Sequence, residues 1–221
     1  FSFSKTQCAV FKGIDRAVFL DKREFIGPIY TQIEEAVDFV LRNIRLGATI
    51  DGLVRKEKYE LPPEAIREMI INAHCHRNLL DESCIQVAVY DERLEVTSPG
   101  GLYNGLTYEE VMNGHSKIRN KGIANIFSQM GLVEAWGSGI KRILNAAEEY
   151  GLSKPRFQEF DNMFRVELFR SSFPMTNGKE NIGETSEKHR RSIGGSVENR
   201  PQRYTEKDYK VTFRRSSIIS S

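Results

Sequence analysis

The sequence is short of several features that would assign it to a large class of proteins. Its three cysteines, Cys8, Cys75 and Cys84, form no paired framework, so a disulfide-stapled secreted domain is excluded and a reducing compartment is expected. No apolar run approaches the roughly 18 residues that a membrane-spanning helix needs. The opening residues lack the charged and apolar segments of a signal peptide. We therefore expect a cytoplasmic protein with no membrane partner.

Two motifs that would indicate a specific chemistry are also missing. The chain has no Gly-x-x-x-x-Gly-Lys-Ser/Thr phosphate loop, and the run from Gly137 to Lys141 does not meet that spacing. A helicase motor built on such a loop is therefore excluded. His74, Cys75, His76 and Cys84 do not form a zinc motif, because adjacent residues on a helix point in different directions and no second close pair of ligands is present.

Charge is nearly balanced over the chain but uneven along it. The formal net charge is only +2, and residues 171–221 carry more Lys and Arg than Asp and Glu, with few apolar residues. Such a composition cannot bury enough area to offset chain entropy, so we interpret residues 171–221 as a basic linker or tail leading to a further module. The absence of a starting Met and the strand-like opening indicate a piece of a longer protein.

The periodicity of the apolar residues predicts alternating strands and helices. The expected elements, in chain order, are strands at 8–11 and 18–20, helices at 29–44 and 62–73, strands at 85–89 and 94–96, a short helix after the capping box Thr107-x-x-Glu110, helices at 122–130 and 139–150, and a strand at 164–168.

Three polar residues of the second expected helix stand four apart. Glu68, Asn72 and His76 therefore share one stripe of that helix and can face a common ligand. An amide oxygen suits a hard cation such as Mg²⁺, and a carboxylate can orient or deprotonate a water molecule. The alternative is a solvated helix face with this spacing by chance.

Two glycine-containing segments favour the first interpretation. Ser98-Pro99-Gly100-Gly101 directly follows an expected strand, where glycine lets the backbone approach a ligand closely. Gly137-Ser138-Gly139 precedes an expected helix whose N-terminal amides can receive phosphate oxygens. Each segment alone is a common turn, but the two in this order after Glu68 and Asn72 indicate a nucleotide site.

These motifs together resemble one family, labelled ATP-dependent DNA helicase, RecG-related, C-terminal. The resemblance spans about residues 25–170 and implies a GHKL-type ATP-binding fold, shared by histidine kinases, gyrases and mismatch-repair proteins. That fold is an α/β two-layer sandwich with helices on one face of a mixed sheet. The family also implies a transcriptional regulator with an upstream Schlafen AlbA-like DNA-binding domain, whose last strands residues 1–25 resemble. The segments that carry the resemblance are Pro63–Arg77, Tyr90–Val96, Ser98–Leu102, Gly114–Asn120 and Gly137–Ile143.

The resemblance also implies a role for each segment. Glu68 matches the general-base glutamate and Asn72 the asparagine that binds Mg²⁺. Ser98 to Leu102 takes the place of the first glycine box, Gly137 to Gly139 that of the second, and Asn113 to Asn120 that of the lid over the phosphates. The expected catalytic residue is Glu68, and the expected nucleotide-binding residues are Asn72, His76, Ser98, Gly100, Gly101, Leu102, Ser116, Arg119, Asn120, Gly137, Ser138 and Gly139.

Two functional hypotheses remain open. In the first, residues 26–170 bind ATP and Mg²⁺, with weak ATPase activity, and control the assembly of a homodimeric regulator that contacts DNA through its upstream domain. In the alternative, the fold is degenerate, binds no nucleotide and serves as a dimerisation scaffold. GHKL proteins carry an Asp in the first box that receives the adenine amino group, and the absence of an acid between Ser98 and Leu102 favours the alternative.

Overall fold

The structure is a computed structural model that describes residues 4–51, 54–132 and 139–171, so Gly137, Ser138 and the expected tail from residue 172 lie outside it. The elements, in chain order, are β1 (Thr6–Phe11), β2 (Phe19–Phe25), α1 (Ile29–Asn43), β3 (Leu46–Asp51), β4 (Val54–Tyr59), α2 (Pro63–His76), β5 (Ile85–Val89), β6 (Arg93–Pro99), α3 (Tyr108–Met112), α4 (Lys121–Gln129), α5 (Gly139–Glu149), β7 (Arg156–Phe160) and β8 (Met163–Phe169).

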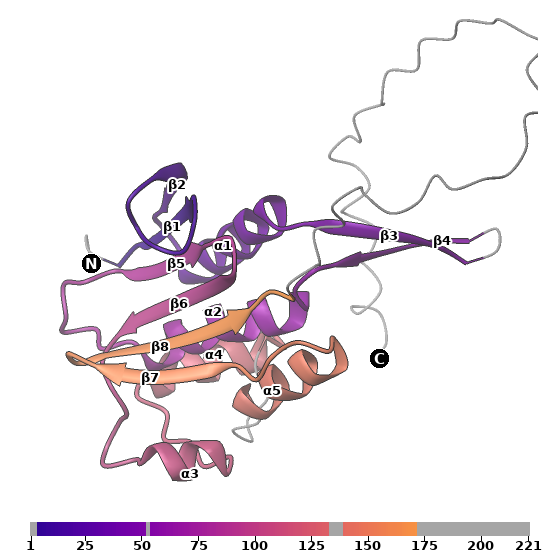
Figure 1. The fold of residues 1–221 in the computed structure, drawn as a ribbon. Helices are drawn as coiled ribbons and strands as arrows, with labels where there is room; N and C mark the ends of the chain where they lie inside the picture. The colour runs from indigo at the N-terminus through magenta and orange to yellow at the C-terminus, as the bar shows by residue number, and fades with distance from the viewer. Residues whose placement is uncertain (1–3, 52–53, 133–138, 172–221) are drawn as a thin grey trace, which may run out of the picture. The chain divides into compact units, whose positions relative to one another are not determined.

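Six of the strands form one mixed sheet in the order β2-β1-β5-β6-β8-β7 (Figure 1). β1 pairs with β5 in parallel, and the other neighbours pair antiparallel. The expected hairpin is β5–β6, in which Val87 lies opposite Val96. β1 and β2, which the sequence suggested as the end of a preceding domain, lie at one edge of this same sheet.

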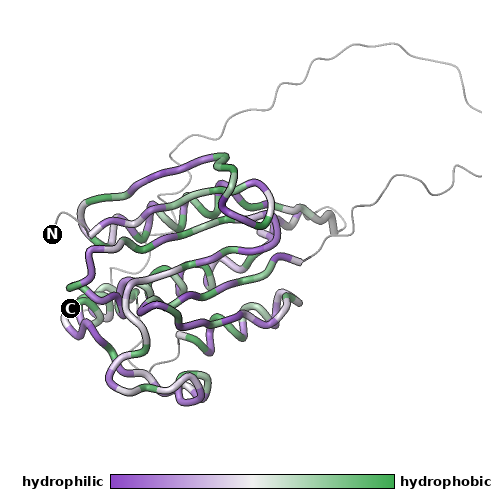
Figure 2. Tube along the Cα trace, turned by 60° about the vertical axis from the view of Figure 1, so that its left-hand side comes forward, coloured by the Kyte–Doolittle hydropathy of each residue, from purple (hydrophilic) through white to green (hydrophobic). Residues whose placement is uncertain are grey.

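The helices lie on one face of the sheet, as the predicted α/β two-layer fold requires. α2 is the central helix, with α1 and α5 packed against it and β6 beneath it. In Figure 2 the helices alternate between hydrophobic and hydrophilic residues along their length, as expected of helices with one buried side. The core between the layers takes Cys8, Val87, Leu94 and Leu168 from the strands, all nearly fully buried.

The opposite face of the sheet carries charged side chains that pair with one another. Glu95 on β6 and Glu167 on β8 are opposite each other in register and almost fully buried. Burial alone would raise the pKa of Glu95, but the hydrogen bond from Arg93 and the charges of Arg165 and Arg16 outweigh it, so this pKa lies below its ordinary value. Glu167 pairs with Arg93 and Arg156. The Glu95 carboxylate therefore stays ionised at neutral pH.

β3 and β4 form a separate two-stranded ribbon, which the sequence did not predict. At its base the Arg45 N–H donates to Glu60 Oε1 over 2.7 Å, and the Glu60 N–H donates to the Arg45 carbonyl over 3.0 Å. Arg170 adds an ion pair with the same Glu60 carboxylate at 3.1 Å. Lys58 of β4 lies over the ring of Tyr150, 3.7 Å from its centroid, so the ribbon also touches the end of α5.

The expectations about cysteines and metals can be checked over the same residues. Cys8, Cys75 and Cys84 are free thiols. Within the described ranges, no cluster of three or more His, Cys, Asp or Glu side chains is arranged to hold a metal ion. No helix in those ranges has the length and hydrophobicity to cross a membrane.

Candidate functional site

A cavity lies between α2, the loop after β6 and the start of α5. Its volume is about 130 Å³, against the roughly 10–15 Å³ that one water molecule needs, so it admits a larger ligand. Apolar side chains from three strands form its floor, and polar groups from the helices form its rim. The predicted site residues that line it are Glu68, Asn72, His76, Ser98, Gly100, Gly101, Leu102, Ser116 and Gly139.

Glu68 and Asn72 face the cavity together because they stand one turn apart on α2. The amide nitrogen of Asn72 donates to Glu68 Oε1 over 3.1 Å. Glu68 is only 7% exposed, and Asn72 is half-buried. Since its nitrogen is used on Glu68, the carbonyl oxygen of Asn72 is the atom of that side chain that remains for a cation. The predicted helix stripe is therefore a cavity wall and not a solvated face.

His76 and Cys75 continue this wall at the end of α2. Burial, helped by the charge of Arg119, lowers the pKa of His76, so its imidazole is neutral at neutral pH and can donate one hydrogen bond and accept another. Burial, and the nearby Glu68 carboxylate, raise the pKa of Cys75 to about 12. Cys75 is therefore a thiol that packs, and not a nucleophile.

The start of α5 comes so close to α2 that any side chain larger than glycine's would displace the ends of two α2 side chains. A methyl group on Gly139 would collide with the Glu68 carboxylate and would lie 2.7 Å from the amide nitrogen of Asn72. Gly139 thus brings the N-terminus of α5, whose first backbone N–H groups have no partner within the helix, close to the carboxylate and amide. Arg142, one turn later on α5, places its guanidinium 3.5 Å from Glu68 Oε2.

The loop after β6 is held open by a glycine and a set of backbone hydrogen bonds. Gly100 has a φ of +98°, which side-chain-bearing residues rarely adopt, and its N–H donates to the Asn162 carbonyl over 2.7 Å. The Leu102 N–H donates to Glu159 Oε1 over 3.0 Å. Ser98 is the next-to-last residue of β6. It is 4% exposed and lines the cavity.

Two predicted nucleotide-binding residues, Arg119 and Asn120, make hydrogen bonds to loop carbonyls. Arg119 donates from Nη2 to the Gly101 carbonyl over 2.7 Å, and its guanidinium lies 4.9 Å from the centroid of the Tyr103 ring. Asn120 donates to the Arg77 carbonyl over 2.7 Å. Neither residue lines the cavity. Both fix the path of the loops around the site instead.

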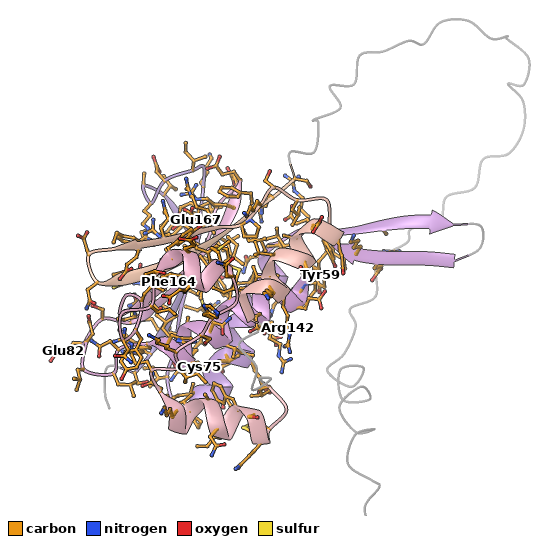
Figure 3. The ribbon with its side chains drawn as sticks, turned by 90° about the horizontal axis from the view of Figure 1, so that it is seen from below. Tyr59, Cys75, Glu82, Arg142, Phe164 and Glu167 are labelled. Carbon is orange, nitrogen blue, oxygen red and sulfur yellow. The ribbon has the colours of Figure 1, made fainter. Side chains whose placement is uncertain are left out.

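Arg142 and Lys117 line the cavity although sequence reasoning gave them no role. Lys117 lies in the connection between α3 and α4 and donates to the Asn104 carbonyl over 2.9 Å. Arg142 could have been found from its spacing, because residues three apart on a helix share a face and Gly139 was already assigned to the site. Arg142, Cys75 and Phe164, three lining residues from three elements, are labelled in Figure 3.

The donor set of the cavity fits a magnesium nucleotide. An amide oxygen beside a carboxylate provides hard oxygen ligands for the cation. Arg142, Lys117 and the N–H groups at the start of α5 provide positive charge for phosphate. At the other end, the Ser98 hydroxyl both donates and accepts, and apolar side chains surround it.

Comparisons with known proteins agree with this architecture. A family described as "Putative ATP-dependent DNA helicase recG C-terminal" matches residues 82–168. No curated protein matches the chain. Among solved structures, the crystal structure of the DIP2311 protein from Corynebacterium diphtheriae is similar, with a TM-score of 0.69 at 23% identity over 76% of this chain. At that identity the likeness concerns the fold alone, and this chain covers 35% of the length of that protein.

The matched segment is narrower than the resemblance seen in the sequence. It includes the loop after β6 and the helices α3, α4 and α5, and it ends within β8. It begins after α2, so Glu68 and Asn72 lie outside it, as do residues 1–25. The family resemblance to this ATPase-like group is therefore confirmed for residues 82–168, where the chain carries two of the three walls of the cavity.

Proposed function

We propose that this chain binds a nucleoside triphosphate, ATP, with Mg²⁺ in the cavity between α2, the loop after β6 and the start of α5. The observation that carries the proposal is the close approach of the Gly139 backbone to Glu68 and Asn72, whose side-chain ends would have to shift to admit a Cβ atom. Glycine at this position keeps the approach free of any side chain from α5. It is useful where backbone N–H groups must reach a phosphate beside a cation.

Each side chain has a distinct task in this proposal. Asn72 Oδ1 holds Mg²⁺, which neutralises phosphate charge when bound. Arg142 and the α5 N–H groups hold the phosphates. In hydrolysis, Glu68 takes a proton from water as the water oxygen bonds to the terminal phosphorus and the bond to the bridging oxygen breaks, giving ADP and inorganic phosphate.

We further propose that nucleotide occupancy regulates a DNA-binding transcriptional regulator of which this chain is a part. Support for this part is the basic surplus after residue 171, since β1 and β2 belong to the sheet that carries the cavity. DNA contact belongs to the upstream domain in this proposal, and the cavity supplies the signal that controls the assembly of a homodimer.

A second candidate function is a dimerisation scaffold that binds no nucleotide. Two observations favour it. Ser98 stands where GHKL proteins have an acid, and Glu68 is engaged by Arg142 at 3.5 Å. One binding experiment distinguishes the scaffold from the nucleotide-binding function.

The experiment measures the thermal unfolding midpoint of residues 1–221 with and without Mg-ATP. Ligand that binds only the folded state raises the midpoint, by roughly 5–10 °C at a concentration about 100 times Kd. Asn72→Ala should remove most of that rise, because it removes the only amide ligand for Mg²⁺ on α2. Asn145→Ala, an exposed asparagine of α5 outside the cavity, is the matched control and should retain it. No rise for the unmodified chain at millimolar Mg-ATP would support the scaffold.

A further inference from the structure

Arg142 engages the carboxylate to which the proposed function assigns the chemistry. Its side chain is 37% exposed, while that of Glu68 is 8% exposed. Asn72 donates to one oxygen of Glu68, and the Arg142 guanidinium lies 3.5 Å from the other. In this nucleotide-free arrangement both oxygens of Glu68 lie beside a donor from the protein.

The pairing is one that a phosphate group can replace. A guanidinium is a planar fork of N–H donors that matches phosphate as well as carboxylate. Arg142 is partly exposed on the cavity side, so its ion pair with Glu68 is weaker than a fully buried one. A terminal phosphate beside Glu68 presents two negative oxygens to the same guanidinium. The guanidinium would then leave Glu68 for the phosphate.

We propose that Arg142 is the residue by which the site distinguishes a nucleoside triphosphate from a diphosphate. This rests on the proposed function, because water activated by Glu68 attacks the terminal phosphorus, which must therefore lie beside Glu68 and within reach of Arg142. A diphosphate has no group at that position. It leaves Arg142 on Glu68, and Glu68 is released as a base only when the triphosphate is bound.

A purely structural role for Arg142 makes a different prediction. If Arg142 only compensates the buried charge of Glu68, its removal lowers the stability of the nucleotide-free chain. The affinities for ATP and for ADP then fall by the same factor. If it senses the terminal phosphate, the two nucleotides respond differently. The ratio of the two affinities therefore separates the roles, and it does not depend on turnover.

The first measurement is calorimetric binding of Mg-ATP and Mg-ADP to the full chain. Arg142→Gln should lower the affinity for Mg-ATP roughly tenfold to hundredfold, the range expected for a lost charge-assisted hydrogen bond. The affinity for Mg-ADP should stay within about twofold of that of the unmodified chain. Arg142→Lys should recover part of the ATP affinity, because it keeps the charge without the fork. Arg67→Gln removes one charge at an exposed position of α2 outside the cavity and should change neither affinity. An equal loss for ATP and ADP in Arg142→Gln would overturn the proposal.

The second measurement tests the competition itself. Glu68→Gln removes the carboxylate that holds Arg142, so ATP affinity should rise in this variant and the rise should vanish when Arg142→Gln is also present. Additive effects of the two substitutions would contradict the exchange of partners. If the unmodified chain binds neither nucleotide, the proposed function fails and this inference fails with it. If it binds both with an unchanged ratio in Arg142→Gln, only the inference fails.

Discussion

At Gly139, the first residue of α5, the backbone runs against two side chains of α2. Alanine favours helix over glycine by about 0.5–1 kcal/mol, so propensity alone predicts that Gly139→Ala stabilises the chain. The shift that the methyl group forces on the ends of the Glu68 and Asn72 side chains acts in the opposite direction, because their mutual hydrogen bond must rearrange. We expect no gain in the thermal midpoint and a loss of Mg-ATP affinity of about tenfold or more.

The control for this substitution is Gly122→Ala in α4. Gly122 lies near the start of a helix with no atom within 4 Å of an added methyl group and an ordinary backbone conformation. Gly122→Ala should leave the thermal midpoint unchanged or raise it slightly. If Gly139→Ala behaved like Gly122→Ala, the close approach of α5 to α2 would be absent in solution.

Some of the predicted site residues line the cavity and others do not, for a physical reason. Glu68 and Asn72 belong to a long helix, so their spacing fixes their relative direction whatever the rest of the chain does. Arg119 and Asn120 lie in a connection, where direction depends on the loop path, and their donors satisfy the carbonyls of Gly101 and Arg77. A sequence pattern cannot distinguish a donor that serves a ligand from one that serves the backbone.

Among the elements, α3 depends most on its end groups because it is only five residues long. The predicted capping box is confirmed: the Glu110 N–H donates to Thr107 Oγ1, and the Thr107 N–H donates to Glu110 Oε2 over 2.8 Å. Thr107→Ala removes this cap, which is typically worth about 1 kcal/mol. Val111 of α3 lines the cavity, so fraying of this helix would loosen one wall.

The expected result is faster hydrogen exchange of the amides of residues 108–112 in Thr107→Ala, with a small change in the global midpoint. Thr107→Ser keeps the hydroxyl and should leave the exchange rates close to those of the unmodified chain. Unchanged exchange in Thr107→Ala would show that packing, and not the cap, holds α3.

Most of the elements that periodicity predicted have one buried side, and β2, whose Phe19 and Leu20 are exposed, is an exception. α1, α2, the β5–β6 hairpin, α4, α5 and β8 all pack on the core, and burial imposes the spacing that is readable in the sequence. β3 and β4 were missed because the run from Arg55 to Lys58 in β4 is charged throughout and shows no alternation of apolar and polar residues. β7 was missed because it is an edge strand of five residues, with Phe157 as its one fully buried side chain.

For the molecule as a whole, one buried histidine sets a dependence of stability on pH. His74 of α2 contacts the Thr6 hydroxyl of β1 at 3.2 Å, and Thr6 donates to Gln32 of α1 over 3.0 Å. Burial, and then the charge of Arg77, lower the pKa of His74 to about 3. An unfolded histidine has a pKa near 6.5. The unfolded chain therefore binds a proton that the folded chain does not.

Stability should consequently be complete above about pH 6.5 and fall as the pH drops toward 3, by at most about 1.4 kcal/mol per pH unit from this group. His76, whose pKa burial also lowers, adds in the same direction. Urea unfolding between about pH 7.5 and pH 5 measures the slope. His74→Gln should flatten it, and His115→Gln, at an exposed position, should not. An equal slope in all three proteins would refute the assignment.

The order of strands in the sheet has a consequence for synthesis on the ribosome. β1 is made first, yet its parallel partner β5 follows only after β2, α1, the ribbon and α2 have emerged. Until then β1 has only β2, and a lone hairpin is marginally stable. β6 pairs early with β5, but its second partner, β8, is made last. β8 brings Phe164 and Val166 to the cavity. Because these contacts join distant parts of the chain, folding is slow compared with a helical bundle. A nascent chain that stops before β8 has α2 and α5 but no finished cavity.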